Sequence, residues 1–132
     1  MKALGTNVIV RFLVRDDKKQ AEIVYRLFKR AESTNEPFFV PLLVVLETIW
    51  VLESVYEIPR EEIRASLQEL LLMPILTFEA QSALQSTLSA AQINKIDLAD
   101  LLIAHSAKFS NCDGGLTFDK KASDFMLFEQ LK

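Results

Sequence analysis

The sequence contains a single cysteine, Cys112, among 132 residues, so no internal disulfide bond can form. It has no excess of positive charge either, because 15 Lys and Arg stand against 18 Asp and Glu, a net charge of −3. This balance gives no sign of a broad basic surface, so a phosphate ligand would need a local patch or a metal. The most apolar run, residues 37–52, is broken by Pro41 and Glu47 and falls short of the roughly 20 residues that span a bilayer. With no signal-peptide pattern after Lys2, we expect a cytoplasmic protein without a membrane segment.

Apolar residues at helical spacing alternate along the chain with short apolar runs, which is typical of alternating helices and strands. We expect helices at residues 6–14, 16–34, 42–56, 58–72, 79–92 and 95–109, strands or extended segments at 2–4, 36–41, 74–78 and 116–119, and an irregular tail at 120–132. Strands separated by helices predict an α/β fold with a parallel sheet covered on both faces and ligands at the carboxyl ends of its strands. The length and the apolar half of the composition predict a single domain over residues 1–132. A mean hydropathy of +0.18 suggests that a partner covers part of the apolar surface.

Three carboxylates follow strands or interrupt apolar helix faces, which makes them the first candidates for chemistry. Glu47 is the only charge in residues 37–52, so we expect it to be partly desolvated, which is costly for a lone acid. Asp100 lies on an apolar stripe of its helix, one turn after Asp97, and Asp119 closes the last expected strand. Two carboxylates roughly 4 Å apart repel by about 4 kcal/mol at an effective dielectric of about 20. Converging acids therefore favour Mg²⁺ or Mn²⁺, which can activate a water molecule against a phosphodiester.

Each acid also has a purely structural interpretation. Glu47 could pair with Arg11 or Arg15, because a buried charge needs a partner. Asp119 could only start a turn, and Asp97 could only cap or flank its helix. The residues taken singly leave both interpretations open.

Other polar residues carry weaker signals. His105 falls among apolar residues of its helix, which predicts a core histidine rather than a catalytic base. Basic residues in the helix expected at 16–34 are typical of a solvated face, although they could help to hold RNA phosphates. They are Lys18, Lys19, Lys29 and Arg30.

The segments MKALGTNVIVRFLVRDD, LLVVLETIWVL, DLADLLIAHSAK and GGLTFDKKA follow one another along nearly the whole chain. In order and spacing they resemble the motifs of PIN-domain ribonucleases, in particular the VapC-type toxins of bacterial toxin–antitoxin modules. The resemblance implies a PIN-like α/β/α sandwich with a central parallel sheet. It also places Glu47, Asp100 and Asp119 at the second, third and fourth acidic positions of the family, as catalytic residues and metal ligands, with Asp97 as an additional candidate ligand.

The polar residues around those acids match the family as well, at Thr6, Asn7 and Thr117. The first acidic position does not match. The family has Asp-Thr-Asn-Val or Asp-Thr-Ser-Val after a short apolar strand, whereas this chain has Gly5 before Thr6, Asn7 and Val8. A glycine supplies no side-chain ligand, although it could serve only to ease a tight turn from strand to helix. Because the rest of the motif is intact, we interpret the chain as a nuclease inactivated at Gly5, with natural loss of activity as the alternative.

The resemblance implies an endoribonuclease that uses Mg²⁺ or Mn²⁺ and cleaves RNA such as tRNA or ribosomal RNA. It implies a homodimer neutralised by a VapB-type antitoxin, with DNA bound only through that antitoxin. The apolar helices within residues 42–72 could form the antitoxin groove or could be ordinary core, which we favour for Trp50; the groove residues would be Trp50, Val51, Val55 and Tyr56. A second hypothesis is a catalytically silent PIN module that only binds an antitoxin.

Overall fold

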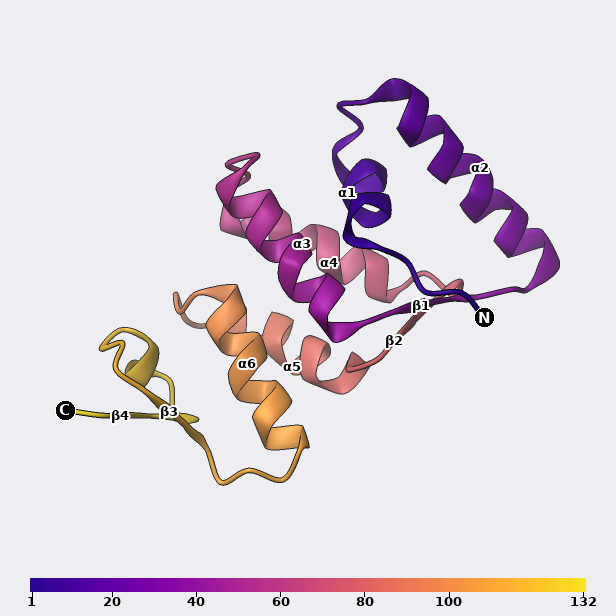
Figure 1. Ribbon diagram of the computed structural model, residues 1–132. Coiled ribbons are helices and arrows are strands. Elements are labelled where there is room, and N and C mark those ends of the chain that lie inside the picture. The colour runs from indigo at the N-terminus through magenta and orange to yellow at the C-terminus, as the bar shows by residue number, and fades with distance from the viewer. The chain divides into compact units, whose positions relative to one another are not determined.

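The computed structural model describes all 132 residues, and the chain divides into two compact units, Met1–Glu79 and Ala80–Lys132. Each unit is described by itself. The first unit holds four helices and two strands (Figure 1). They are α1 (Thr6–Val14), α2 (Lys18–Thr34), β1 (Phe38–Val40), α3 (Leu42–Ser54), α4 (Arg60–Leu71) and β2 (Leu76–Phe78).

Three extended segments of the first unit run parallel, with β1 between the other two. Strand β1 pairs with β2 from Phe38 opposite Leu76 to Val40 opposite Phe78. On its other edge, Phe39 forms a parallel bridge with Ala3. The expected strand at residues 2–4 is therefore a single bridge, whose carboxyl end leads directly into α1.

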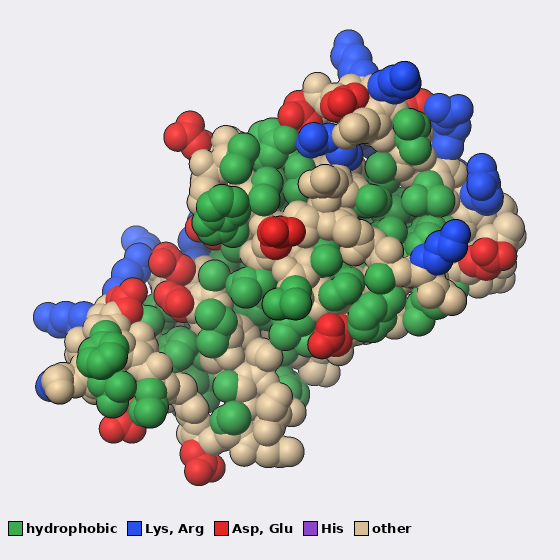
Figure 2. All heavy atoms as spheres, in the orientation of Figure 1, with side chains coloured by type: hydrophobic (Ala, Val, Ile, Leu, Met, Phe, Trp, Pro, Cys, Tyr) green, Lys and Arg blue, Asp and Glu red, His purple; other side chains and the backbone are tan.

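Apolar faces of the helices fill the core of the first unit. The amphipathic pattern of α2 buries one side of that helix and leaves its charged side exposed, and Figure 2 shows Lys and Arg side chains gathered over it. Phe28 of α2 contacts Phe12 and Phe38 with tilted rings, whose centroids lie 4.9 and 5.9 Å from its own. Long aliphatic side chains of the other elements complete the core: Ile9, Val40, Ile49, Leu52, Ile63, Leu67 and Leu70 are each at most 2% exposed.

The second unit contains two helices, a short 3-10 helix and two strands. They are α5 (Gln81–Ala91), α6 (Leu98–Phe109), β3 (Gly115–Thr117), the 3-10 helix Ala122–Asp124 and β4 (Phe128–Gln130). Helices α5 and α6 pack through Leu84, Leu88, Leu101 and Leu102, all buried. His105 is buried beside them, with Nδ1 2.7 Å from the carbonyl oxygen of Leu101. It is the core histidine that the sequence predicts.

The tail at residues 120–132 is more regular than expected. Strand β4 lies parallel to β3, with Gly115 opposite Phe128 and Thr117 opposite Gln130. The N–H of Gly115 donates to the carbonyl oxygen of Leu127, and the N–H of Leu131 donates to that of Thr117, each at 2.7 Å. The expectation of an irregular tail is wrong because a strand of three residues is too short to show a hydrophobic period.

Helices joined to parallel strands confirm the α/β class expected from the sequence. No helix of the structure is both long enough and apolar enough to cross a membrane.

Candidate functional site

In the first unit, the structure brings together two residues that the sequence predicts for the site. Thr6 is the first residue of α1, and its hydroxyl donates a hydrogen bond to Oε1 of Glu47 in the middle of α3. Asn7 is exposed in the same first turn of α1. The position of Gly5 therefore adjoins the Thr6–Glu47 pair at the carboxyl end of the segment that bridges β1.

Gly5 occupies its position without using the conformational freedom of glycine. It is the N-cap of α1 in an extended conformation, with φ −83° and ψ 164°, which any L residue adopts. A Cβ atom added to Gly5 would meet nothing within 4 Å. The idea that Gly5 eases a tight turn is therefore wrong, and a larger side chain would extend into open space beside Thr6.

Glu47 is exposed rather than desolvated, which corrects a second expectation. Its apolar neighbours in the sequence do not cover it, because Val45, Thr48, Ile49 and Leu52 turn to the buried side of α3. The opposite side carries Glu47 together with Leu43 and Trp50, at spacings of four and three residues that share a helix face; these two apolar side chains are 78% and 61% exposed.

The arginines proposed as structural partners of Glu47 do not pair with it. Arg11 instead donates through Nε to Gln20 Oε1 at 2.7 Å and through Nη1 to Tyr56 Oη at 3.1 Å. It also forms an ion pair with Asp16 at 3.3 Å. This network ties α1 to the beginning of α2 and the end of α3, and Glu47 keeps its carboxylate for other contacts.

In the second unit, three candidate acids influence one another. Asp97 is the N-cap residue of α6 and Asp100 lies in its first turn, while Asp119 follows β3. Burial raises the pKa of the Asp100 carboxyl above its usual value, and the negative charges of Asp97 and Asp119 raise it further. Such mutual repulsion is what a bound cation would relieve.

Asp119 also has the turn-forming role considered as its structural interpretation. Its Oδ1 accepts hydrogen bonds from the N–H groups of Lys121 and Ala122, at 2.8 and 3.2 Å. Thr117 Oγ1 accepts the N–H of Asp119 at 3.0 Å. The two oxygens of Asp119 are thus unequal, because Oδ1 holds the turn while Oδ2 has no hydrogen bond.

Lys121 is a residue of this cluster that the sequence analysis missed. Its Nζ lies 3.8 Å from Oδ1 of Asp97, and its positive charge lowers the pKa of Asp100 against the other influences. Asp97 flanks α6 as its N-cap residue, in agreement with its structural interpretation, although its side chain makes no capping hydrogen bond. The sequence feature that could have indicated a cation near these acids is the pair of lysines directly after Asp119.

The donors in both units are of the kind that Mg²⁺ and Mn²⁺ prefer, since all are carboxylate or hydroxyl oxygens. Within either unit, however, no group of three or more His, Cys, Asp or Glu side chains is close enough to hold a metal ion. The donor chemistry therefore fits such a metal, although neither unit by itself holds a complete ligand set.

The residues predicted for an antitoxin groove differ in exposure. Trp50 and Val55 are 61% and 60% exposed, so core is the wrong interpretation for Trp50. Val51 and Tyr56 are half-buried, and the hydroxyl of Tyr56 donates to Asp16 Oδ2 at 2.9 Å.

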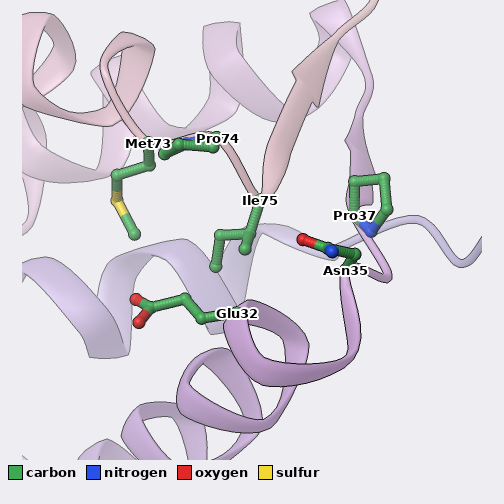
Figure 3. Close-up of a pocket in the computed structure, with 6 residues that line it drawn as sticks. All are labelled: Glu32, Asn35, Pro37, Met73, Pro74 and Ile75. Atoms are coloured by element: carbon green, nitrogen blue, oxygen red, sulfur yellow. The ribbon is translucent and has the colours of Figure 1, made fainter.

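A hollow of the first unit lies away from these candidate residues. Its volume is about 630 Å³, and it is lined by residues that precede β1 and β2, including Asn35, Pro37, Pro74 and Ile75 (Figure 3). It is therefore at the amino ends of the two strands, whereas Gly5 and Thr6 follow the carboxyl end of the neighbouring segment.

Comparison with known proteins agrees with the fold. The family model of the PIN domain matches residues 3–125, so the chain belongs to the PIN domain family, and the match runs through both units. A VapC ribonuclease of Aquifex aeolicus (strain VF5) is 35% identical over 63 residues, which cover 48% of this chain and 46% of that protein. The aligned stretch thus spans about half the length of this curated relative.

Proposed function

We propose that the chain is a VapC-type toxin, a metal-dependent endoribonuclease that is inactivated by glycine at the first acidic position. The observation that supports this proposal most directly is the structural environment of Gly5. It adjoins the Thr6–Glu47 pair, has a backbone conformation open to any residue and has free space where a side chain would stand. An aspartate fits this position without strain, although the chain has none there.

Glu47, Asp100 and Asp119, with Asp97 as a fourth candidate, would hold Mg²⁺ or Mn²⁺. When bound, the ion would activate water and stabilise negative charge on the scissile phosphate. Thr6 fixes the rotamer of Glu47 by donating to Oε1, which leaves Oε2 for a ligand. The Asp119 turn fixes Oδ1 in the same way and leaves Oδ2. Burial raises the pKa of the Asp100 carboxyl, and the negative charges of Asp97 and Asp119 raise it further, so a bound cation would favour its ionised form.

Loss of the first aspartate removes one ligand and one negative charge from this arrangement. Catalysis depends on rigid placement of charge opposite the developing charge of the transition state, so the loss reduces rate far more than it affects folding. One base change converts an aspartate codon to a glycine codon, and a toxic nuclease is difficult to produce unless it is disarmed. We therefore favour an inactivated form of a working toxin.

The partners in this proposal are RNA, such as tRNA or ribosomal RNA, and a VapB-type antitoxin, in a cytoplasmic homodimer that reaches DNA only through the antitoxin. The exposed apolar face of α3 supports the antitoxin contact, because a tail helix that binds in a groove needs such a surface. Trp50 and Val55 would contact the tail directly, while Val51 and Tyr56 would form the floor of the groove.

A catalytically silent module that only binds an antitoxin is the second candidate. The specific observation in its favour is Gly5 itself, which leaves the ligand set incomplete. Expression of the Gly5→Asp variant without an antitoxin separates the two candidates. The nuclease predicts growth arrest with fragmented cellular RNA, abolished by a further Glu47→Gln or Asp100→Asn change. Normal growth with a folded, well-expressed Gly5→Asp protein would favour the silent module.

A further inference from the structure

The net charge of the chain hides a strong local asymmetry. Residues 1–34 contain eight Lys and Arg against four Asp and Glu, whereas residues 35–132 contain seven against fourteen. Five of the eight cations belong to α2, which has only two acids, and all five are exposed. Figure 2 shows blue Lys and Arg side chains along the outer side of that helix. The five are Lys18, Lys19, Arg26, Lys29 and Arg30.

Burial of the opposite side of α2 fixes the direction in which these cations point. Ala21, Val24, Phe28 and Ala31 are in the core, so the basic side chains are held toward solvent along one side of the helix. The rise of 1.5 Å per residue separates Lys18 from Arg30 by about 18 Å along the axis. We call this surface the α2 basic face.

Acidic partners neutralise only part of the α2 basic face. Arg26 pairs with Glu22 at 3.6 Å and Lys29 with Glu32 at 3.8 Å, and all four side chains are more than half exposed. Lys18, Lys19 and Arg30 have no ion pair. Of the two acids just before α2, Asp17 caps the helix by accepting the N–H of Gln20, and Asp16 binds Arg11 and Tyr56.

The position of two of the unpaired lysines is unfavourable for the helix itself. Lys18 and Lys19 are the first two residues of α2, where the helix dipole favours negative side chains and disfavours cations. A purely structural role does not account for cations at this end. A polyanionic ligand does, because its phosphate groups would pair with both lysines.

Two further features of the α2 basic face suit nucleic acid. Tyr25 is 42% exposed between the cations, with Lys29 Nζ 5.7 Å from its ring centroid, so its ring is available to stack on an unpaired base. At the other end of α2, Arg30 lines a hollow of about 490 Å³ together with Lys2 and Phe38.

We propose that the α2 basic face binds the sugar–phosphate backbone of RNA, with Lys18, Lys19 and Arg30 as its main phosphate contacts. The inference deepens the proposed function, because it assigns to RNA a contact surface outside the acidic positions. Binding at this face needs neither the metal nor an aspartate at position 5. An acidic protein partner is the competing occupant.

The test measures binding of a fluorescein-labelled RNA hairpin to the unsubstituted chain by fluorescence anisotropy, in EDTA and over a series of NaCl concentrations. The variant Lys18→Gln/Lys19→Gln/Arg30→Gln is compared with Lys95→Gln/Lys108→Gln/Lys132→Gln, which removes the same charge elsewhere. The α2 variant should bind about tenfold or more weakly, and the slope of log affinity against log salt should fall by about 2 to 3, as expected for three lost phosphate contacts. The control variant should change both quantities much less.

Equal losses of RNA affinity in the two variants, or no RNA binding by the unsubstituted chain, would overturn the inference. Unchanged RNA affinity of the α2 variant would also overturn it and would favour an acidic protein at this face. The midpoint of thermal unfolding of the α2 variant should be unchanged or higher, which excludes misfolding as the cause of weak binding. Failure of Gly5→Asp to cleave RNA refutes the proposed function and leaves this binding result standing, so the two failures are distinguishable.

Discussion

The hydroxyl of Thr6 donates a hydrogen bond to Oε1 of Glu47, and this bond joins the first turn of α1 to the middle of α3. The two residues are 41 positions apart in the sequence, and both are among the residues that the sequence predicts for the candidate site. Because α1 begins directly after Gly5, the bond also fixes the distance between the first acidic position and the second.

Thr6→Val should lower the free energy of unfolding by about 1 kcal/mol, because it leaves the shape nearly unchanged and removes the donor. Urea denaturation of both proteins measures the difference. Thr6→Ser retains the hydroxyl and should recover most of the loss, while Asn7→Ala, on the exposed side of the same turn, should stay within about 0.5 kcal/mol. Equal free energies of unfolding for the Thr6→Val variant and the unsubstituted chain would show that the Thr6–Glu47 bond contributes nothing to stability.

The repulsion around Asp100 predicts a stability that depends on pH. Burial and the charges of Asp97 and Asp119 raise its pKa in the folded state above the ordinary value of 3.8. The folded state therefore binds the Asp100 proton more tightly than the unfolded chain does. The protonated carboxyl of Asp100 contributes its full stabilisation at pH values below its pKa in the unfolded chain, and this stabilisation is lost as the pH rises through its pKa in the folded state.

The side chain of the Asp100→Asn variant cannot ionise, so this variant should be more stable than the unsubstituted chain at about pH 7. The difference in the free energy of unfolding should disappear near pH 4 or below. Urea denaturation at the two pH values checks this. Asp113→Asn, at an exposed acid in the turn before β3, serves as the control and should show no such closing difference. A destabilised Asp100→Asn protein at pH 7 would mean that the ionised carboxylate has a stabilising partner.

The exposure of Trp50 predicts that this large side chain contributes little to the fold. Trp50→Ser should change the free energy of unfolding by no more than about 0.5 kcal/mol. Leu52→Ala, two residues further on and only 1% exposed, should cost about 2 to 5 kcal/mol. Chemical denaturation compares the two variants, and a large loss for Trp50→Ser would place this residue in a core after all.

The helices could be predicted from the sequence because each carries several turns of periodic apolar residues. Helix α1 has the predicted bounds, and α2 to α6 begin or end within a few residues of expectation. The strands are three residues long, so their pattern is weak, and β4 was missed because its pairing with β3 depends on backbone hydrogen bonds that no side-chain pattern reports.

The candidate site was predictable in its residue types and not in its environment. The motifs selected Glu47, Asp100 and Asp119, but the exposure of Glu47 depends on which side of α3 packs into the core. Helical spacing alone could have indicated this, since Glu47 shares its face with Leu43 and Trp50. The contact of Lys121 with Asp97 joins two loops and depends on tertiary structure.

The central claim is that glycine at position 5 alone separates this chain from an active ribonuclease. The most direct measurement is cleavage of total cellular RNA by purified Gly5→Asp protein in Mn²⁺ and in EDTA, beside the chain with Gly5 and the Gly5→Asn variant. Asparagine caps α1 as well as aspartate does but supplies no negative charge, so it controls for any effect on folding. The account predicts Mn²⁺-dependent cleavage by Gly5→Asp and no cleavage by the other two proteins. A folded Gly5→Asp protein that binds Mn²⁺ and leaves every RNA intact would contradict it.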